Sequence, residues 1–220
     1  MKNKKSIFII IAVLIASIVM IYVDNFLRPS YFIKAVIKAV LFLGFPAIYS
    51  ILFHDSFSQV RNLFVAKKGH LLKSLAMGAG IGALILCAYF CLRPFVDFAG
   101  VAASLDEENF IPIIIYVALC NSLLEEFFFR GFAFMLLKKE GNRKFAYVFS
   151  SALFAAYHTG VVDSWFGVGL FALMMVGLFI GGCIFNWLNE SHEDIYSSWF
   201  VHMFINVGIN IVGCILLDII

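Results

Sequence analysis

Charge is what this sequence has least of. Asp, Glu, Lys and Arg make up 14% of the residues, against about 25% in soluble proteins, while 63% of the residues are hydrophobic. A soluble globular domain is therefore excluded, and the chain is predicted to be an integral membrane protein whose first partner is the lipid bilayer. The net charge of +2 argues against a nucleic-acid partner, because such proteins present a strongly basic face.

Other absences narrow the function. The sequence has no internal repeat, which counts against a transporter built from inverted repeats. It has no H-E-x-x-H motif, the helical signature of many zinc proteases. Its five cysteines all lie within apolar runs, which favours small packing residues over disulfides or a metal cluster.

Seven apolar runs are candidates for crossing a bilayer, which takes about 20 helical residues. The predicted fold class is therefore all-α, a polytopic transmembrane helix bundle of about seven spans. We expect three N-terminal spans in residues 1–110 and a catalytic core of four helices in residues 111–220. The predicted spans are Ile7–Leu27, Phe32–Phe53, Leu71–Leu92, Ile111–Leu137, the short Phe145–Tyr157, Trp165–Leu188 and Ser197–Leu217.

The distribution of Lys and Arg predicts the orientation, because cytoplasmic loops retain positive charge. With the N-terminus in the cytoplasm, the basic segments 2–5, 61–73 and 138–144 all fall on the cytoplasmic side. We therefore expect a multi-pass protein of the cell membrane with a cytoplasmic N-terminus. The basic residues that this orientation places on the opposite side are Arg28, Lys34, Lys38 and Arg93.

Three charged residues, Glu125, Glu126 and Arg130, interrupt the fourth apolar run. A charge at the bilayer centre costs roughly 2.5 to 3.5 kcal/mol, so such residues face the protein interior and are functional by default. Glu126 and Arg130 are four residues apart, which predicts a structural ion pair. Because neighbouring helix residues point about 100° apart, Glu125 should face elsewhere and perform the chemistry. On this interpretation, loss of Arg130 costs stability and loss of Glu125 costs only activity. The alternative is a purely structural network of all three residues.

Two histidines and an asparagine lie in later spans. His158 follows Phe154 by one helical turn, and His202 is followed at i+4 by Asn206. At 1.5 Å per residue, Glu125 lies about 20 Å and His158 about 21 Å from the same basic loop, so their depths match. His202 should lie at a lower level, about 12 Å deep, unless its span begins late.

A polar group that faces lipid is costly, so we expect Glu125, His158, His202 and Asn206 to converge on one cavity open to the cytoplasmic half of the bilayer. There a carboxylate can act as a general base on water, and an imidazole and an amide can donate to an oxyanion. The predicted chemistry is hydrolysis of an acyl bond. The carboxylate and the two imidazoles could also bind a divalent metal such as Zn. The other histidines, expected in solvated loops, are His54, His70 and His192.

Three motifs give a family resemblance. E-E-F-F-F-R-G (Glu125–Gly131), F-A-A-Y-H (Phe154–His158) and H-M-F-I-N (His202–Asn206) resemble the signature motifs of the CPBP intramembrane peptidases. This family, also called Abi, contains the CAAX prenyl proteases and bacteriocin-processing enzymes. The motifs occur in the family order, with one span between the second and the third.

The resemblance implies a peptidase in which Glu125 activates water with help from His158, while His202 and Asn206 stabilise the oxyanion. It implies either a glutamate-type or a metal-dependent mechanism, with Glu125, His158 and His202 as the metal ligands in the second case. The residues that would shape the site are Glu126, Arg130 and Phe154.

Two functions from different classes follow. The first is an intramembrane endopeptidase that cuts a membrane-embedded or lipid-associated protein or peptide, as a CAAX protease does. The second is a non-proteolytic bacteriocin self-immunity protein on the same scaffold. The complete motif set favours the enzyme, because a protein that only binds has no reason to keep a buried glutamate with two histidines. A proton or ion transporter is a third hypothesis, which the absence of an internal repeat in the sequence disfavours.

Overall fold

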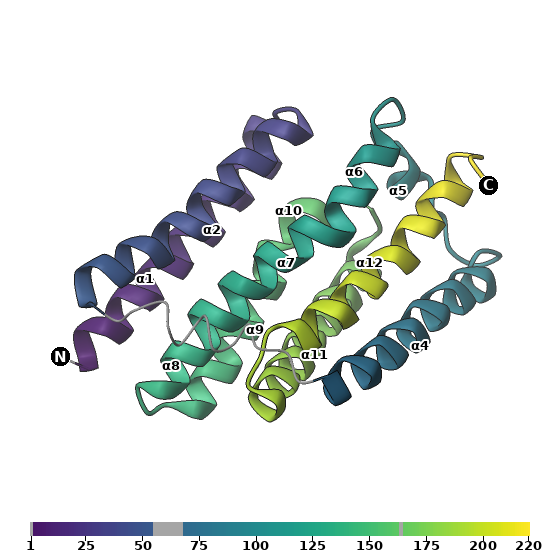
Figure 1. Cartoon of the computed structure of the whole chain (residues 1–220). Helices are drawn as coiled ribbons and strands as arrows, with labels where there is room; N and C mark the ends of the chain where they lie inside the picture. The colour runs from purple at the N-terminus through teal and green to yellow at the C-terminus, as the bar shows by residue number, and fades with distance from the viewer. Residues whose placement is uncertain (1, 55–67, 163–164) are drawn as a thin grey trace.

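The structure, a computed structural model, describes residues 2–54, 68–162 and 165–220. In these ranges all regular structure is helical, which confirms the all-α class. Seven helices are long and apolar enough to cross a membrane, as predicted. They form one bundle, and the two chain ends lie at opposite ends of it (Figure 1), as an odd number of crossings requires. The basic segment 61–67 lies outside the described residues.

The N-terminal part contains three of the spans. Helix α1 (Lys2–Tyr22) continues into the π-helical turn η1 (Val23–Leu27) and is followed by α2 (Tyr31–Phe53). Helix α4 (Lys68–Leu92) is the third span, and the short α5 (Ala99–Ala103) follows it.

The remaining four spans contain the three motifs. The fourth span is one continuous helix that consists of α6 (Phe110–Tyr116), η2 (Val117–Asn121), α7 (Ser122–Glu125), η3 (Glu126–Met135) and α8 (Leu136–Lys139). The fifth consists of α9 (Arg143–Tyr157) and α10 (Thr159–Val162), which completes the run that is short in the sequence. The last two are α11 (Val168–His192) and α12 (Tyr196–Leu216).

The fourth span is long and partly π-helical. Its 30 residues would cover about 45 Å as an α-helix, more than the hydrocarbon core of about 30 Å. The segments η2 and η3 interrupt it on either side of α7, so Glu125 is the last residue before ten π-helical residues. Such interruptions are rare and are frequent at functional sites.

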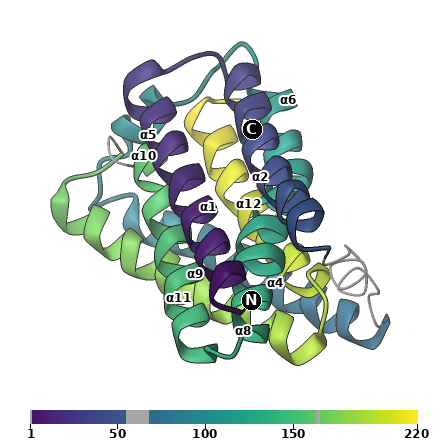
Figure 2. The same cartoon turned by 90° about the vertical axis from the view of Figure 1, so that its left-hand side faces the viewer.

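Helices α1 and α2 form a hairpin on one flank of the bundle (Figures 1 and 2). The hairpin packs through aromatic rings: Phe42 stacks on Phe128 at 4.1 Å between centroids and meets Phe129 edge-on at 5.6 Å. Lipid tails are as apolar as these side chains, so close packing and ring contacts, each about 0.5 to 1.5 kcal/mol, hold the hairpin in place.

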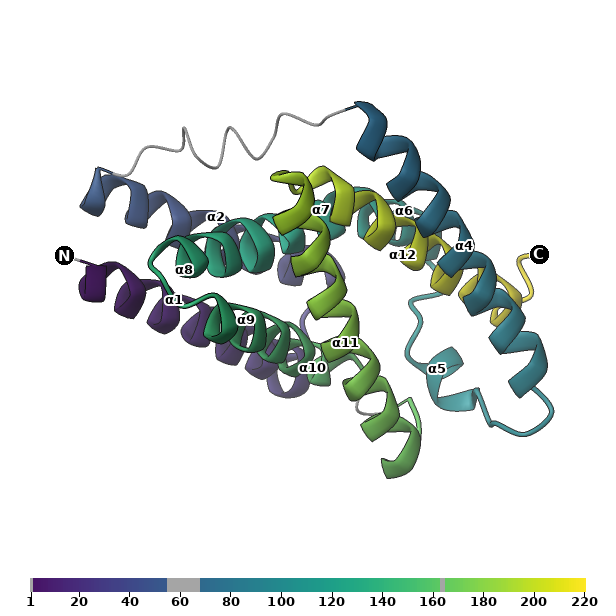
Figure 3. The same ribbon diagram turned by 90° about the horizontal axis from the view of Figure 1, so that it is seen from below.

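On the opposite flank, α4 packs along α12 (Figures 1 and 3). Small residues allow this close approach: a Cβ added at Gly208 would lie 2.9 Å from the carbonyl oxygen of Gly82, and one added at Gly78 would lie 3.0 Å from the Cβ of Phe204. Glycine is common at such helix contacts in membranes. Helix α12 is thus held between α4 and the fourth span, with His202 facing the interior.

Candidate active site

Glu125 lies near the middle of the fourth span and is 2% exposed. Its Oε1 accepts hydrogen bonds from Asn121 Nδ2 at 2.7 Å, Tyr157 Oη at 3.1 Å and Lys38 Nζ at 3.2 Å. Its Oε2 has no hydrogen-bond partner among the described residues. One oxygen of the carboxylate is therefore saturated by three donors, and the other is available.

The available oxygen faces both predicted histidines. Glu125 Oε2 lies 3.8 Å from His158 Nε2 and 3.8 Å from His202 Nε2. His158 follows the last residue of α9 and His202 lies in the first half of α12, so three spans bring these groups together. One water molecule can bridge groups at this spacing, which is the arrangement a general base requires.

The other ring nitrogen of each histidine is already occupied. His158 Nδ1 lies 2.7 Å from the carbonyl oxygen of Phe154, which can only accept, so this nitrogen carries a proton. His202 Nδ1 donates in the same way to Glu126 Oε1 at 2.9 Å. In the neutral form, both Nε2 atoms therefore present lone pairs towards Glu125. The hydrogen bond at Nδ1 fixes the orientation of each ring.

The predicted ion pair is present. Glu126 Oε2 and Arg130 Nε are 3.4 Å apart, and both side chains are fully buried. The Arg130 guanidinium also lies over the ring of Phe154 at 3.9 Å and near that of Phe185 at 5.0 Å, a favourable cation–π arrangement. Glu126 contacts both Arg130 and His202, so this pair also supports one of the imidazoles.

Glu125 and Glu126 meet the same ring, against the expectation that they face different groups. Glu125 lies beside Nε2 of His202, and Glu126 accepts from Nδ1. The backbone angles at both residues are α-helical (φ −67°, ψ −43° at Glu125 and φ −63°, ψ −41° at Glu126), so the two side chains do point in different directions. A wide imidazole with nitrogens on opposite sides can meet two side chains that point in different directions.

Asn206 stands apart from this group. Its Nδ2 donates to the carbonyl oxygen of Val117 at 3.2 Å, and Asn210, one turn later, donates to that of Ile114 at 3.2 Å. The polar stripe of α12 is thus present, but the two asparagines that follow His202 donate to the backbone of the fourth span. Each amide keeps a second N–H, and that of Asn206 lies one turn from His202.

The position of His202 differs from the depth expected for it. Its distance from Asp194 along the chain predicts a lower level than that of Glu125, yet the two side chains meet. The turn between α11 and α12 is partly buried: Asp194, Ile195 and Ser197 are all 0% exposed, whereas Glu193 is exposed. A count of residues from Asp194 therefore does not predict which groups His202 meets.

The donor types at the site, one carboxylate oxygen and two imidazole nitrogens, are those of a zinc site. Their spacing does not fit one. Ligands at about 2.0 to 2.1 Å in a tetrahedron lie about 3.3 Å apart, closer than the 3.8 Å between Glu125 Oε2 and each Nε2. Within the described ranges, no group of three His, Cys, Asp or Glu residues is placed to hold a metal ion.

Lys38 is the residue that sequence reasoning missed. The prediction that Lys38 lies among the charges on the outer side of the membrane is wrong: Lys38 lies inside α2, is 9% exposed and contacts Glu125 and Asn121. The available signal was a lysine within an apolar run, which has the same functional meaning as an intramembrane glutamate. Tyr157, within the second motif, was also not singled out.

This lysine changes one expectation. If Glu125 is replaced by a neutral residue, the Lys38 ammonium remains in the interior without a carboxylate, and a buried charge without its partner is destabilising. Loss of Glu125 is therefore expected to cost stability as well as activity.

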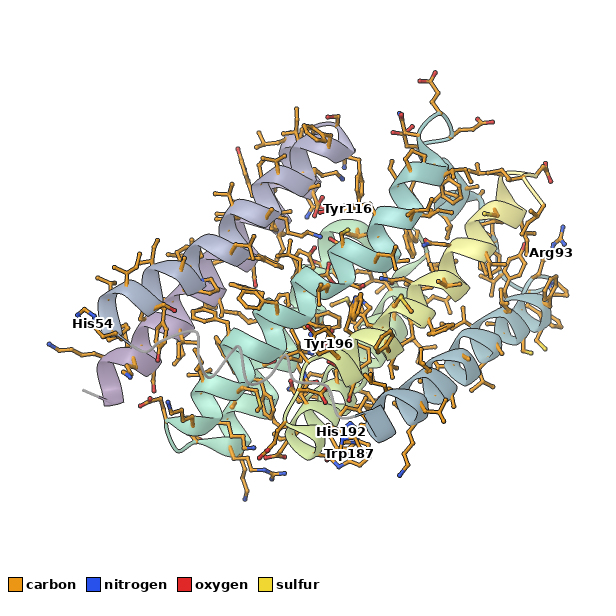
Figure 4. All side chains as sticks on the ribbon, viewed as in Figure 1. His54, Arg93, Tyr116, Trp187, His192 and Tyr196 are labelled. Atoms are coloured by element: carbon orange, nitrogen blue, oxygen red, sulfur yellow. The ribbon has the colours of Figure 1, made fainter. Side chains whose placement is uncertain are left out.

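The remaining histidines differ in their exposure to solvent. His54 ends α2 and is exposed, as expected. His70 and His192 instead stack on each other at 3.9 Å between ring centroids, so the expectation of solvated loops is wrong for them. Figure 4 shows His54 and His192 at the edge of the bundle, far from its centre.

Comparison with known proteins gives one family match. Residues 107–208 match the family model described as type II CAAX prenyl endopeptidase Rce1-like. The matched segment contains all three motifs, and its similarity to a family of CAAX prenyl endopeptidases is consistent with the CPBP resemblance. No curated protein and no solved structure matches the chain. Lys38 lies outside the matched segment.

Proposed function

We propose that the protein is an intramembrane endopeptidase that hydrolyses a peptide bond of a membrane-associated protein or peptide, in the manner of the CAAX proteases. One observation carries the proposal: in the segment matched by the peptidase family, a buried carboxylate directs one free oxygen at two imidazoles, each 3.8 Å away. This is the arrangement expected for activating a water molecule where bulk water is excluded.

In the proposed first step, a water molecule lies between Glu125 Oε2 and His158 Nε2. It gives one proton to Glu125 while its oxygen forms a bond to the scissile carbonyl carbon. His158 accepts a hydrogen bond from the other proton, because its Nδ1–H is held by the backbone and its Nε2 has a lone pair. Glu125 then returns its proton to the nitrogen of the leaving amine as the C–N bond breaks.

His202 has the role of donor to the oxyanion. Because Glu126 holds a proton on Nδ1, His202 can donate from Nε2 only as an imidazolium. Glu126 accepts from this ring as well as pairing with Arg130, so it has a function beyond that pair. The second N–H of Asn206 supplies a further donor. A preorganised oxyanion donor is worth about 10²- to 10³-fold in rate.

We further propose that the protein resides in the cell membrane with its N-terminus in the cytoplasm, and that the site opens to the cytoplasmic half of the bilayer. The clusters of Lys and Arg at residues 2–5 and 138–144 support this orientation.

In a chain whose native cysteines are replaced, Asp106→Cys should react with an impermeant maleimide added outside. Lys139→Cys should react only after the membrane is opened, and the reverse pattern would contradict this topology.

The catalytic proposal is tested with purified protein in lipid nanodiscs and a quenched-fluorescent peptide that ends in a farnesylated CAAX sequence. We expect cleavage by the wild type, none by Glu125→Gln, and normal cleavage by Glu108→Gln, which removes an exposed carboxylate of the outer loop. Mass spectrometry of membranes with active and Glu125→Gln protein would identify a natural substrate. The result that contradicts the proposal is equal turnover or equal membrane proteomes for wild type and Glu125→Gln. That outcome would favour an immunity protein that acts by binding.

A further inference from the structure

Lys38 is the charged group of this site that lies outside the segment matched by the peptidase family. It comes from α2, in the part of the chain that holds no recognised motif. An ammonium in an apolar span is costly unless it is paired, and here its pairing is with the group that the proposed mechanism uses as a base.

The contacts of Lys38 determine the orientation of its neighbours. Its Nζ donates to Asn121 Oδ1 at 2.6 Å and to Glu125 Oε1 at 3.2 Å. Because the Asn121 oxygen accepts from the ammonium, the amide nitrogen must face the other way, and it donates to the same Glu125 oxygen at 2.7 Å. The ammonium also lies over the ring of Tyr157 at 5.0 Å, whose hydroxyl is the third donor to that oxygen.

All of these donors act on Oε1, which leaves Oε2 as the oxygen that faces the histidines. A carboxylate in a buried site of low polarity needs a nearby positive charge to remain ionised. Arg130, the neighbouring cation, is paired to Glu126 and lies over Phe154. Lys38, in contrast, contacts Glu125 directly.

We propose that Lys38 is a positioning residue. It holds Glu125 ionised, with Oε1 occupied and Oε2 directed at His158 and His202, so that the N-terminal hairpin completes the active site. Its catalytic meaning rests on the proposed peptidase function. A purely structural role is less well supported, because stacking of Phe42 on Phe128 already attaches α2 to the fourth span.

The test compares Lys38→Met with Lys34→Met. Lys34 lies one turn earlier on α2 and pairs with Asp24 at 3.1 Å, so its loss removes a similar charge from the same helix. With the farnesylated peptide, Lys38→Met should lower kcat roughly 10- to 100-fold with little change in KM, since a general base contributes about 10²- to 10⁴-fold. Lys38→Arg should recover most of the rate, and Lys34→Met should be close to wild type.

Infrared difference spectroscopy gives a second readout that needs no substrate. The carbonyl stretch of a protonated carboxylic acid should appear in Lys38→Met at neutral pH, be absent from wild type and Lys34→Met, and disappear in Lys38→Met/Glu125→Gln, which assigns it to Glu125. Should Lys38→Met fail to fold, Lys38→Gln compared with Lys38→Arg gives the same measurement. A spectrum in which Glu125 stays ionised without the lysine, or an unchanged kcat, would overturn the inference. Lack of turnover by the wild type would contradict the peptidase function, and the spectra would still decide the role of Lys38.

Discussion

Two carboxylates in this bundle have nearly the same kinds of partner and use them differently. Glu190 on α11 binds Arg143 through both oxygens at 2.7 Å, accepts from Tyr147 at 2.7 Å and pairs with Lys138 at 3.0 Å. Both of its oxygens are saturated. Glu125 also has a lysine and a tyrosine, but all of its donors act on one oxygen, and the other faces two histidines.

On the proposed function, this difference separates a carboxylate that holds helices together from one that accepts a proton. A structural carboxylate is most stable when every lone pair has a donor, as at Glu190. A general base must keep one oxygen for the proton that it will accept. The number of donors is therefore less informative than their distribution over the two oxygens.

The largest expected difference is in the stability lost when the arginine is removed from the buried Glu126–Arg130 pair or from the exposed Glu190–Arg143 pair. Arg130→Ala leaves Glu126 charged in the interior, and breaking a buried pair costs about 3 to 5 kcal/mol of the free energy of unfolding. Arg143→Ala should cause no measurable loss, because the Arg143 side chain is 61% exposed and surface pairs contribute little. Thermal and denaturant unfolding in detergent measure both variants. Equal losses would mean that burial does not distinguish the two clusters.

The next difference concerns the position of the reactive oxygen. Glu125→Asp keeps the charge but shortens the side chain by one C–C bond, about 1.5 Å. A displacement of about 1 Å at a reacting group can cost 10²-fold in rate, so cleavage of the farnesylated peptide should fall by about that factor. Glu190→Asp makes the same change at the saturated carboxylate and should leave the rate unchanged. A similar rate for both Asp variants would show that the position of Glu125 Oε2 is unimportant.

Local pattern predicted much of this molecule. The seven spans follow from apolar runs, and the pair of Glu126 with Arg130 follows from their spacing on one helix. Depth along each span also placed Glu125 level with His158, which it contacts. These features depend on neighbours within a few residues or on the thickness of a bilayer, and both are readable from one sequence.

What sequence could not predict depends on contacts between distant segments. Lys38 is 87 residues from Glu125, and nothing in its own run indicates which helix it will face. Likewise, His202 is 76 residues from Glu126, and only the folded bundle brings one of its ring nitrogens to Glu126 and the other towards Glu125.

The smallest expected difference is between the two tyrosines. Tyr157→Phe removes one of three donors to Glu125 Oε1, and a hydrogen bond to a charged group is worth about 1.5 to 3 kcal/mol when it is lost outright. Because Lys38 and Asn121 remain on the same oxygen, only part of this is expected, a fall of about 3- to 10-fold in kcat. Tyr147→Phe removes the matching hydroxyl from Glu190 and should leave kcat unchanged. Full activity and equal stability in both Phe variants would contradict this prediction. It would mean that the donors to Glu125 Oε1 do not prepare Oε2 for reaction. The two carboxylates would then differ only in the histidines that face Glu125.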